Sequence, residues 1–188
     1  MLTATLRPKT CGVCEKEFLP ARPMQGVCGP RCAMTKVRAE KARERTKDRE
    51  RKEADKTSGD LKGEAQDAFN AYIRYRDRSE NCIDCGKPFE PGRPGGSVDA
   101  GHFFSRSAAP HLRFNEDNVF AQRKNCNRPG GTTFAAFRSG VVARIGEERT
   151  QAVEAQAKIT PPPVKKGDYR EIRDAYRAKL RELKKGAA

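Results

Sequence analysis

The segment that decides the fold covers residues 97–107 and reads SVDAGHFFSRS. It carries His102, the only credible general base in its neighbourhood, because an imidazole with an unperturbed pKa of about 6.5 is largely neutral at cellular pH and can accept a proton. Asp99 lies three residues earlier. In an extended strand these two side chains point to opposite faces, unless a bulge at Gly101 re-aims one of them. The segment therefore predicts a strand that carries a base and a candidate metal ligand.

Three cysteines flank this segment. Cys82 and Cys85 precede it with a two-residue spacer, and Cys126 follows it. Seven cysteines in a reducing compartment are poor candidates for disulfides, and the odd count points the same way. Metal ligation is therefore the default interpretation of the paired cysteines.

A second cysteine cluster lies near the N-terminus. Cys11 and Cys14 are separated by two residues, and Cys28 and Cys32 by three. Four thiolates from two tight turns can close a tetrahedron around zinc, and the metal then supplies folding energy that so short a loop cannot obtain from hydrophobic burial. The alternative is four unrelated free cysteines. We predict a structural zinc knuckle.

The composition sets limits on the rest of the chain. The 188 residues include 39 Lys and Arg against 25 Asp and Glu, a formal net charge of +14, and only 36% are hydrophobic. Such a chain can bury one small core or two minimal ones. Its positive field attracts polyanions, and nucleic acid is the commonest polyanion that a soluble chain meets. We find neither a membrane-spanning stretch nor the apolar core of a signal peptide, so we expect no membrane partner and a cytoplasmic location.

Helical spacing appears in four places, at residues 36–56, 61–78, 134–157 and 168–184. The first is almost entirely charged and predicts a solvated helix, either a basic arm along DNA or a connector. Residues 57–60, Thr-Ser-Gly-Asp, can cap the second helix.

The last predicted helix carries one apolar stripe, which can dock on the rest of the chain or on a second copy of the protein. A homo-oligomer through this helix is thus one expectation. The stripe consists of Tyr169, Ile172, Tyr176, Leu180 and Leu183.

The order of the motifs around residues 97–107 resembles the HNH, or ββα-metal, endonucleases. In that family a strand delivers a histidine that activates water, a second strand carries an asparagine that steadies the histidine loop, and the following helix supplies a metal ligand. The resemblance implies that His102 is the base and that Asn118 is the asparagine of the second strand. It also implies that Asp99 and Asn127 hold a divalent cation, Mg²⁺ or Mn²⁺, with Asn127 in place of the usual closing histidine.

Hydrolysis of a phosphodiester needs a base for the water and a cation for the charge that develops on the phosphate. Arg106 and Arg113 would hold phosphate oxygens through their planar guanidinium groups. Each residue alone has a simpler interpretation, since a lone strand histidine is more often a hydrogen-bonded residue and an asparagine beside an aspartate often belongs to a turn. The ordered set favours the nuclease.

Nearly the whole chain is similar to the NinG (Rap) recombination protein family of phage lambda and its relatives. The similarity includes the N-terminal four-cysteine knuckle, Ala108-Ala109-Pro110, residues 112–118, Arg144-Ile145-Gly146-Glu147 and the final helix. It implies a structure-selective DNA endonuclease that acts on branched recombination intermediates in a phage-infected bacterium.

These inferences combine into an α+β fold, a small zinc-stapled ββα-metal (HNH-like) module flanked by helices. We divide the chain into a zinc knuckle at 1–35, a charged connector helix at 36–60, the nuclease module with its packing helices at 61–157, and a proline linker with a C-terminal helix at 158–188.

The chain departs from the family pattern at three positions. Phe120 and Pro129 replace family histidines, and Arg123 replaces a zinc-binding cysteine. Three cysteines then remain for the second zinc site, with His111 or a water to complete it.

The departures leave two functions open. The first is an active endonuclease, and the alternative is a catalytically degenerate DNA-binding recombination accessory protein. A third interpretation, an RNA-binding or transcriptional zinc module, has less support, because the sequence shows no recognition helix and no aromatic stacking signature.

Overall fold

The computed structural model describes residues 7–90, 97–160, 162 and 164–186. The chain forms two compact units, Met1–Lys56 and Thr57–Ala188.

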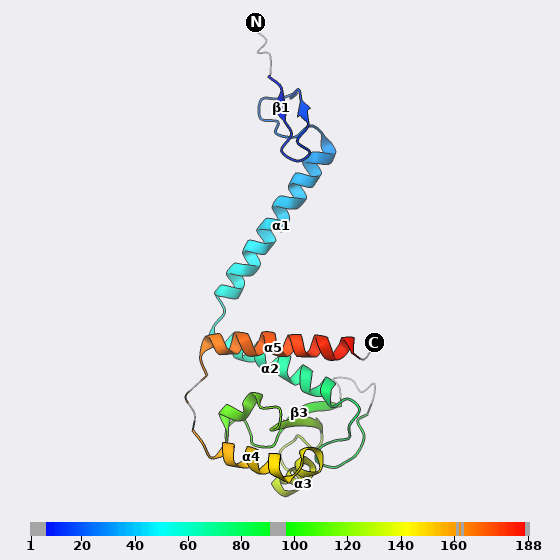
Figure 1. The fold of residues 1–188 in the computed structure, drawn as a ribbon, viewed down its shortest axis with the longest axis vertical. Helices are drawn as coiled ribbons and strands as arrows, with labels where there is room; N and C mark the ends of the chain where they lie inside the picture. Colours follow the sequence, from blue (N-terminus) through cyan, green and yellow to red (C-terminus); the bar gives the residue numbers. More distant parts are fainter. Residues whose placement is uncertain (1–6, 91–96, 161, 163, 187–188) are drawn as a thin grey trace. The chain divides into compact units, whose positions relative to one another are not determined.

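The first unit is a small knuckle followed by one long helix. Strands β1 (Lys9–Thr10) and β2 (Glu17–Phe18) pair antiparallel, and helix α1 runs over Pro30–Ala54 (Figure 1). The predicted charged helix thus begins six residues early, because Pro30 at its first position is already set for helical geometry. None of the residues of α1, all of which the structure describes, is buried. Pairs such as Arg51 with Asp48, 3.1 Å apart, support the helix along its exposed surface.

The second unit begins with a helix whose start the sequence predicts well. Helix α2 covers Ser58–Arg76. The hydroxyl of Thr57 accepts a hydrogen bond from the backbone N–H of Asp60 at 3.1 Å, and the Asp60 carboxylate accepts one from the backbone N–H of Thr57 at 2.9 Å. This reciprocal capping box satisfies two amides that the helix leaves without internal partners, as the sequence of residues 57–60 predicts.

A two-stranded antiparallel sheet forms the centre of this unit. Strand β3 (Val98–His102) pairs with β4 (Val119–Arg123) in one regular register, from Val98 opposite Arg123 to His102 opposite Val119. A short 3-10 helix, η1 (Pro110–Phe114), lies in the connection between them. The alternation of β4 sends Val119 to one face of the sheet and Phe120 to the other. Val119 packs with Phe69, Tyr72 and Ile73 of α2, whereas Phe120 joins a second core with Ile83, Phe103 and Phe137.

The predicted helix at 134–157 is two helices in the structure. Helix α3 covers Phe134–Ile145 and α4 covers Glu147–Ala157. The break lies at Gly146, whose φ of 84° is a backbone conformation that glycine adopts without steric cost. The sequence predicted a single helix because helical spacing continues across the break. That prediction was wrong at Gly146.

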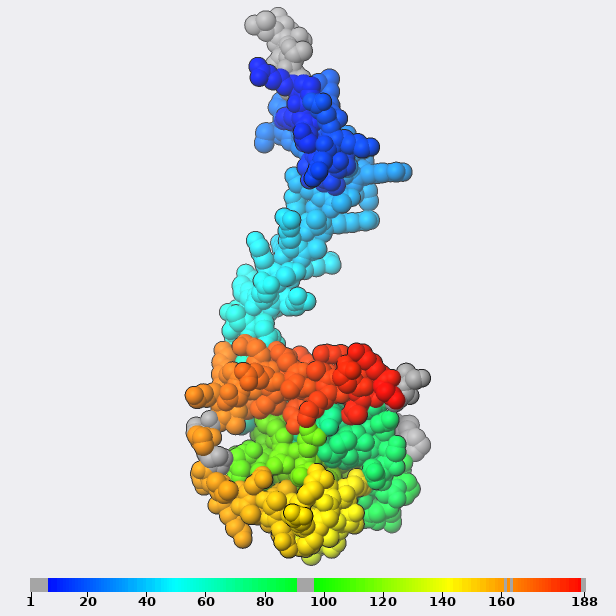
Figure 2. Space-filling view, viewed as in Figure 1, coloured from blue at the N-terminus to red at the C-terminus, as the bar shows by residue number. Residues whose placement is uncertain are grey.

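The C-terminal helix α5 (Lys166–Lys185) packs along α2 of its own chain (Figure 1). Its Tyr176 ring meets the Phe69 ring edge to face, with centroids 4.7 Å apart. Arg173, almost fully buried, pairs with Glu64 of α2 at 2.8 Å. Figure 2 shows the outer side of α5, coloured orange to red, as part of the surface of this unit. The apolar stripe therefore docks within the chain, while a homo-oligomer remains a prediction.

Among the described residues, no helix is both long enough and apolar enough to cross a membrane.

Candidate functional site

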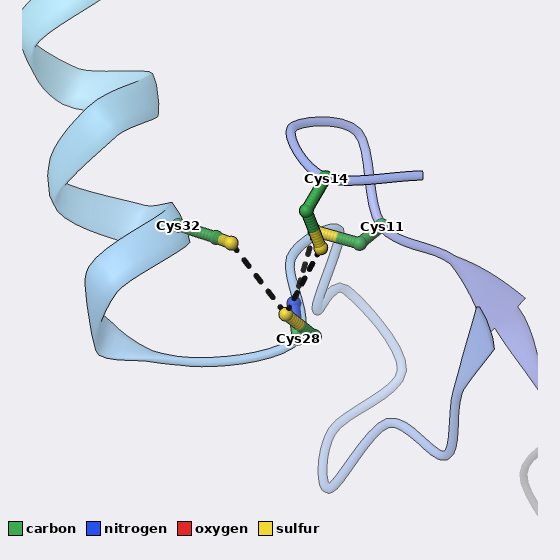
Figure 3. Close-up of side chains that lie close together, drawn as sticks. All are labelled: Cys11, Cys14, Cys28 and Cys32. Carbon is green, nitrogen blue, oxygen red and sulfur yellow. Dashed lines mark hydrogen bonds between the residues drawn. The ribbon is translucent and has the colours of Figure 1, made fainter. Parts of the chain in front are cut away.

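The four N-terminal cysteines lie together with their sulfur atoms pointing toward one another (Figure 3). All four sulfurs are within 4.8 Å of each other, with Cys14 to Cys28 at 3.6 Å and Cys28 to Cys32 at 3.5 Å. Bonds of about 2.3 Å to a tetrahedral zinc place sulfur atoms about 3.8 Å apart. The cluster can therefore hold a metal ion with little movement.

The protonation behaviour of these thiols also indicates a cation. Backbone N–H groups, first that of Cys14, lower the pKa of Cys11 to about 6, which favours the thiolate. In contrast, the adjoining sulfur of Cys28 raises the pKa of Cys32 to about 12. Sulfur atoms this close cannot all be thiolates unless a positive charge lies between them. The donor set therefore fits structural Zn²⁺.

The second cluster contains Cys82, Cys85 and Cys126, again with all sulfurs within 4.8 Å of one another. Its first turn repeats the geometry of the N-terminal one. In both turns the amide four residues after the first cysteine, that of Glu15 or Gly86, bonds to the carbonyl of that cysteine at 3.0 Å. Both of these residues have positive φ, 59° and 65°. Two turns of the same construction support the same metal-binding role.

Arg123, the residue expected from the family pattern to stand in place of a zinc-binding cysteine, lies beside the second cluster. Its backbone N–H donates to the sulfur of Cys82 at 3.3 Å, and its guanidinium pairs with Glu90. Burial opposes ionisation of Cys85, but the backbone amide of Lys87 and the charge of Arg123 are among the causes that lower its pKa. The side chain of Arg123 thus contributes positive charge to the site instead of a ligand.

His111 does not join this cluster, although the sequence suggested it as a possible fourth ligand. Its Nε2 lies 2.8 Å from the carbonyl oxygen of Gln156, at the end of α4. Among the described residues, the group of metal-ligating atoms at the second site contains the three cysteines without it. A water or another exchangeable ligand would have to complete the tetrahedron there.

Most of the predicted catalytic residues line one hollow of about 330 Å³ beside β3, which we call the His102 pocket. Its walls come from α2, from β3 and the loop that follows it, and from the turn after β4. The lining residues are Asn70, Arg74, Asp99, Ala100, His102, Ser105, Arg106 and Asn127.

His102 is half-buried in this pocket and held in one orientation. Its Nε2 lies 3.2 Å from the carbonyl oxygen of Arg113. A carbonyl can only accept a hydrogen bond, so Nε2 must carry the proton and Nδ1 is left as an acceptor. Burial is the main cause that lowers the pKa of His102 to about 4, and the charges of Arg106 and Arg113 act in the same direction. The imidazole is therefore neutral near pH 7.

Asp99 and Asn127 meet at the edge of the same pocket, where Nδ2 of Asn127 donates to Oδ2 of Asp99 at 3.2 Å. The regular pairing of β3 with β4 contains no bulge at Gly101. The bulge that was expected to turn Asp99 and His102 toward the same face is therefore not present. Both residues still line the hollow, together with residues of α2 and of the loop after β3. The pocket thus holds a carboxylate and an amide oxygen next to a neutral imidazole.

Asn118 lies outside the pocket and fixes the loop that follows His102. It is fully buried. Its Oδ1 accepts from the backbone N–H of Phe104 at 2.8 Å, and its Nδ2 donates to the carbonyls of Phe104 at 3.1 Å and Leu112 at 3.0 Å. These three bonds join the two ends of the connection between β3 and β4. Asn118 is therefore a positioning residue.

The two predicted phosphate-binding arginines have different surroundings. Arg106 is exposed and lines the His102 pocket. Arg113 lies next to the pocket and donates through Nε to Oε1 of Gln66 at 2.6 Å. Among the departures from the family pattern, Phe120 is buried in the second core and Pro129 is exposed, and neither lines the pocket.

Three residues that line the pocket were not predicted from the sequence: Asn70, Arg74 and Ser105. Asn70 and Arg74 are four residues apart on α2, a spacing that places them on one helix face. The sequence alone shows that the two side chains share a helix face, but only the packing of α2 against the sheet shows which hollow they line.

Comparison with known proteins gives consistent matches over most of the chain. The family model described as Bacteriophage Lambda NinG protein matches residues 3–186. Protein ninG of Escherichia phage lambda is 31% identical over 194 residues, which cover 91% of this chain and 90% of that protein. Protein ninG of Escherichia phage 933W is 32% identical over 195 residues, or 94% of each chain, and that of Salmonella phage P22 is 30% identical over 194 residues, 91% and 90%. No solved structure matches the chain.

Proposed function

The chain belongs to the NinG family of bacteriophage proteins, and on this premise we propose that it is a metal-dependent DNA endonuclease acting on branched recombination intermediates. The His102 pocket is the active site, and the fold around it is an HNH-like module. The succession of β3, β4 and α3 beside the three-cysteine cluster supports that assignment of the fold.

One observation carries the proposal: a neutral imidazole, a pair of oxygen donors and two cationic side chains line one hollow. His102 supplies the imidazole, Asp99 and Asn127 the oxygens, and Arg74 and Arg106 the cations. Phosphodiester hydrolysis needs these three kinds of group together, because a water must lose a proton while negative charge grows on the phosphate.

The orientation of His102 assigns its role. With Nε2 bound to the carbonyl of Arg113, Nδ1 accepts a proton from a water molecule as the water oxygen bonds to phosphorus. The bond from phosphorus to the leaving oxygen breaks, and that oxygen takes a proton from solvent. Asn118 holds the loop after His102, so that the imidazole keeps its position during the reaction.

Asp99 and Asn127 are the residues that would hold a catalytic Mg²⁺ or Mn²⁺. A carboxylate and an amide oxygen are ligands that such hard cations prefer, and Mg²⁺ commonly takes only one or two carboxylates beside phosphate oxygens and water. The amide of Asn127 now donates to Asp99, and rotation about its last bond turns its oxygen toward the same space. When bound, the cation supplies positive charge to the developing negative charge of the phosphate.

A second candidate, a DNA-binding accessory protein without cleavage activity, is favoured by Arg123. The missing thiolate leaves the second cluster with three cysteines, beside the turn that carries Asn127. If that cluster loses its metal, Asn127 loses its position, and binding of DNA survives without hydrolysis.

The test is cleavage of a labelled four-way junction and a linear duplex of the same sequence, with Mg²⁺ or Mn²⁺ and with a chelator. We expect the wild type to cut the junction in either metal, His102→Ala to bind but not cut, and His111→Ala, which changes the other histidine of the chain, to cut normally. Binding without cleavage by the wild type in every metal favours the accessory protein. Cleavage by His102→Ala at the wild-type rate overturns the proposed active site.

A further inference from the structure

A row of polar side chains runs along α2 at four-residue intervals. Lys62, Gln66, Asn70 and Arg74, here called the α2 row, occupy successive positions of one helical ridge. The row borders the face of α2 that packs on the core, where Phe69 is fully buried. Its side chains therefore lie along the boundary between α2 and the β3–β4 connection.

Hydrogen bonds tie the middle of the row to the other side of this boundary. Gln66, which is only 6% exposed, accepts at Oε1 from Nε of Arg113 at 2.6 Å. Its Nε2 donates to Oδ1 of Asn70 at 2.8 Å. Both ends of the Gln66 amide are therefore fixed in orientation. These two hydrogen bonds do not use the terminal guanidinium nitrogens of Arg113 or the amide nitrogen of Asn70, which can bind other partners.

Two hollows lie at the ends of the row. The first is the His102 pocket, to which Arg74 and Arg106 contribute. The second, of about 230 Å³, is lined by Lys62 and Arg113 and has no carboxylate among its described lining residues. Lys62 and Arg74 are twelve residues apart on one helix, which corresponds to about 18 Å. The two hollows share no lining residue, and the α2 row joins them.

The four cations that line the two hollows form no ion pair with any carboxylate in the part of the chain that the structure describes. They are Lys62, Arg74, Arg106 and Arg113. Elsewhere in the same unit arginines are paired, as Arg138 is with Glu147 and Glu154. Arg106 is close enough to add to the effect of burial in lowering the pKa of Arg113. Among the described lining residues of the His102 pocket, Asp99 is the carboxylate that accompanies Arg74 and Arg106, and the proposed function assigns it to the metal ion. Cations that form no ion pair within the protein stabilise an anionic partner that brings charge at regular intervals.

We propose that the α2 row, with Arg106 and Arg113, is a track that holds successive phosphates of one DNA strand and leads that strand into the His102 pocket. A distance of about 18 Å spans several successive phosphates of one strand, since these advance about 3.4 Å per residue along the axis of the double helix and lie farther apart than that along the strand itself. Asn70 and Gln66 supply uncharged contacts between the cationic ends. The inference deepens the proposed function, on which it rests for the direction of the strand toward His102.

The test measures binding without cleavage. Anisotropy of a labelled four-way junction is followed without added Mg²⁺ or Mn²⁺ and with zinc held constant, between about 50 and 300 mM salt, for wild type and the double variant Lys62→Ala/Arg74→Ala. Each lost phosphate contact should reduce the slope of log K against log salt by about 0.9, so the double variant should lose about 1.8. Lys158→Ala/Arg181→Ala removes two exposed cations outside the track and should keep the wild-type slope.

Asn70→Asp adds an independent arm, because it changes the charge of the track with almost no change of shape. Its junction Kd at low salt should rise at least about tenfold, and thermal melts should confirm that all variants are folded. Equal slopes for the track double variant and the control double variant, together with an unchanged Kd for Asn70→Asp, overturn the track.

The outcomes separate the track from the proposed function. A reduced slope in a protein that cleaves nothing supports the track and refutes the nuclease. Cleavage that depends on His102, with slopes unaffected by Lys62 and Arg74, supports the nuclease and refutes the track.

Discussion

Replacing Asn118 by alanine should destabilise the second unit strongly, because the side chain makes three hydrogen bonds inside the protein. The carbonyl of Leu112 is the partner in the fully buried bond, and Phe104 supplies the partners of the two part-buried bonds. An unsatisfied buried group costs about 1–3 kcal/mol and each part-buried bond contributes about 0.5–1 kcal/mol, so the free energy of unfolding should fall by about 2–5 kcal/mol. At roughly 4 °C per kcal/mol for a unit of this size, the Tm should fall by about 8–20 °C.

Asn127→Ala is the matched control, because it changes the other asparagine assigned to the site. Asn127 is exposed and makes one side-chain bond, to Asp99 at 3.2 Å. Its removal should change the free energy of unfolding by less than about 0.5 kcal/mol while abolishing metal-dependent cleavage. The assay is urea unfolding followed by circular dichroism, with zinc held constant. A stability loss below about 1 kcal/mol for Asn118→Ala, or equal losses for the two variants, refutes this assignment of roles.

Three further predictions concern protonation and zinc. The pKa of His102 is lowered to about 4 from an unfolded value of about 6.5. Between these two pH values the unfolded chain binds a proton that the folded chain does not, so the free energy of unfolding should decline as the pH falls from about 6.5 to about 4. His102→Gln should remove that part of the decline when unfolding is measured as a function of pH. Arg123→Cys should supply a fourth thiolate to the second cluster and raise its zinc affinity at least about tenfold, or roughly 1.4 kcal/mol, measured by competition with a chelator. Unchanged zinc affinity would show that Arg123 does not stand at the ligand position. Cys14→Ser should lower bound zinc by one ion per chain in metal analysis and melt the β1–β2 turn, with unchanged zinc content contradicting the four-cysteine site.

Local signals in the sequence predicted much of the fold. Thr57 and Asp60 form a capping box, and a four-residue motif of this kind fixes a helix start without help from distant residues. The apolar stripe of α5 predicted a docking face, and docking within the chain, which the structure shows against α2, was one of the two alternatives. The cysteine spacings predicted the N-terminal cluster and the Cys82–Cys85 turn of the second, because a metal-binding turn is also local, whereas Cys126 was joined to the second cluster by the family resemblance.

Features that depend on tertiary packing could not be predicted in the same way. The positive φ of Gly146 divides one periodic stretch into two helices, and a single glycine in a helical pattern does not reveal such a break. Alternation along β3 predicts Asp99 and His102 on opposite faces, and the sequence does not show how α2 and the segments after β3 and β4 form one pocket that both residues line. The contribution of Arg74 likewise depends on how α2 crosses the sheet.

The most direct test of the account is the nuclear magnetic resonance spectrum of the two histidines during addition of substoichiometric Mn²⁺. The chain contains only His102 and His111, so their imidazole signals can be assigned by substitution. We predict that Mn²⁺ broadens the His102 signals far more than those of His111, and that Asp99→Ala removes the difference. Equal broadening of both histidines, or none at either, would contradict the placement of a neutral base and a hard cation in one pocket.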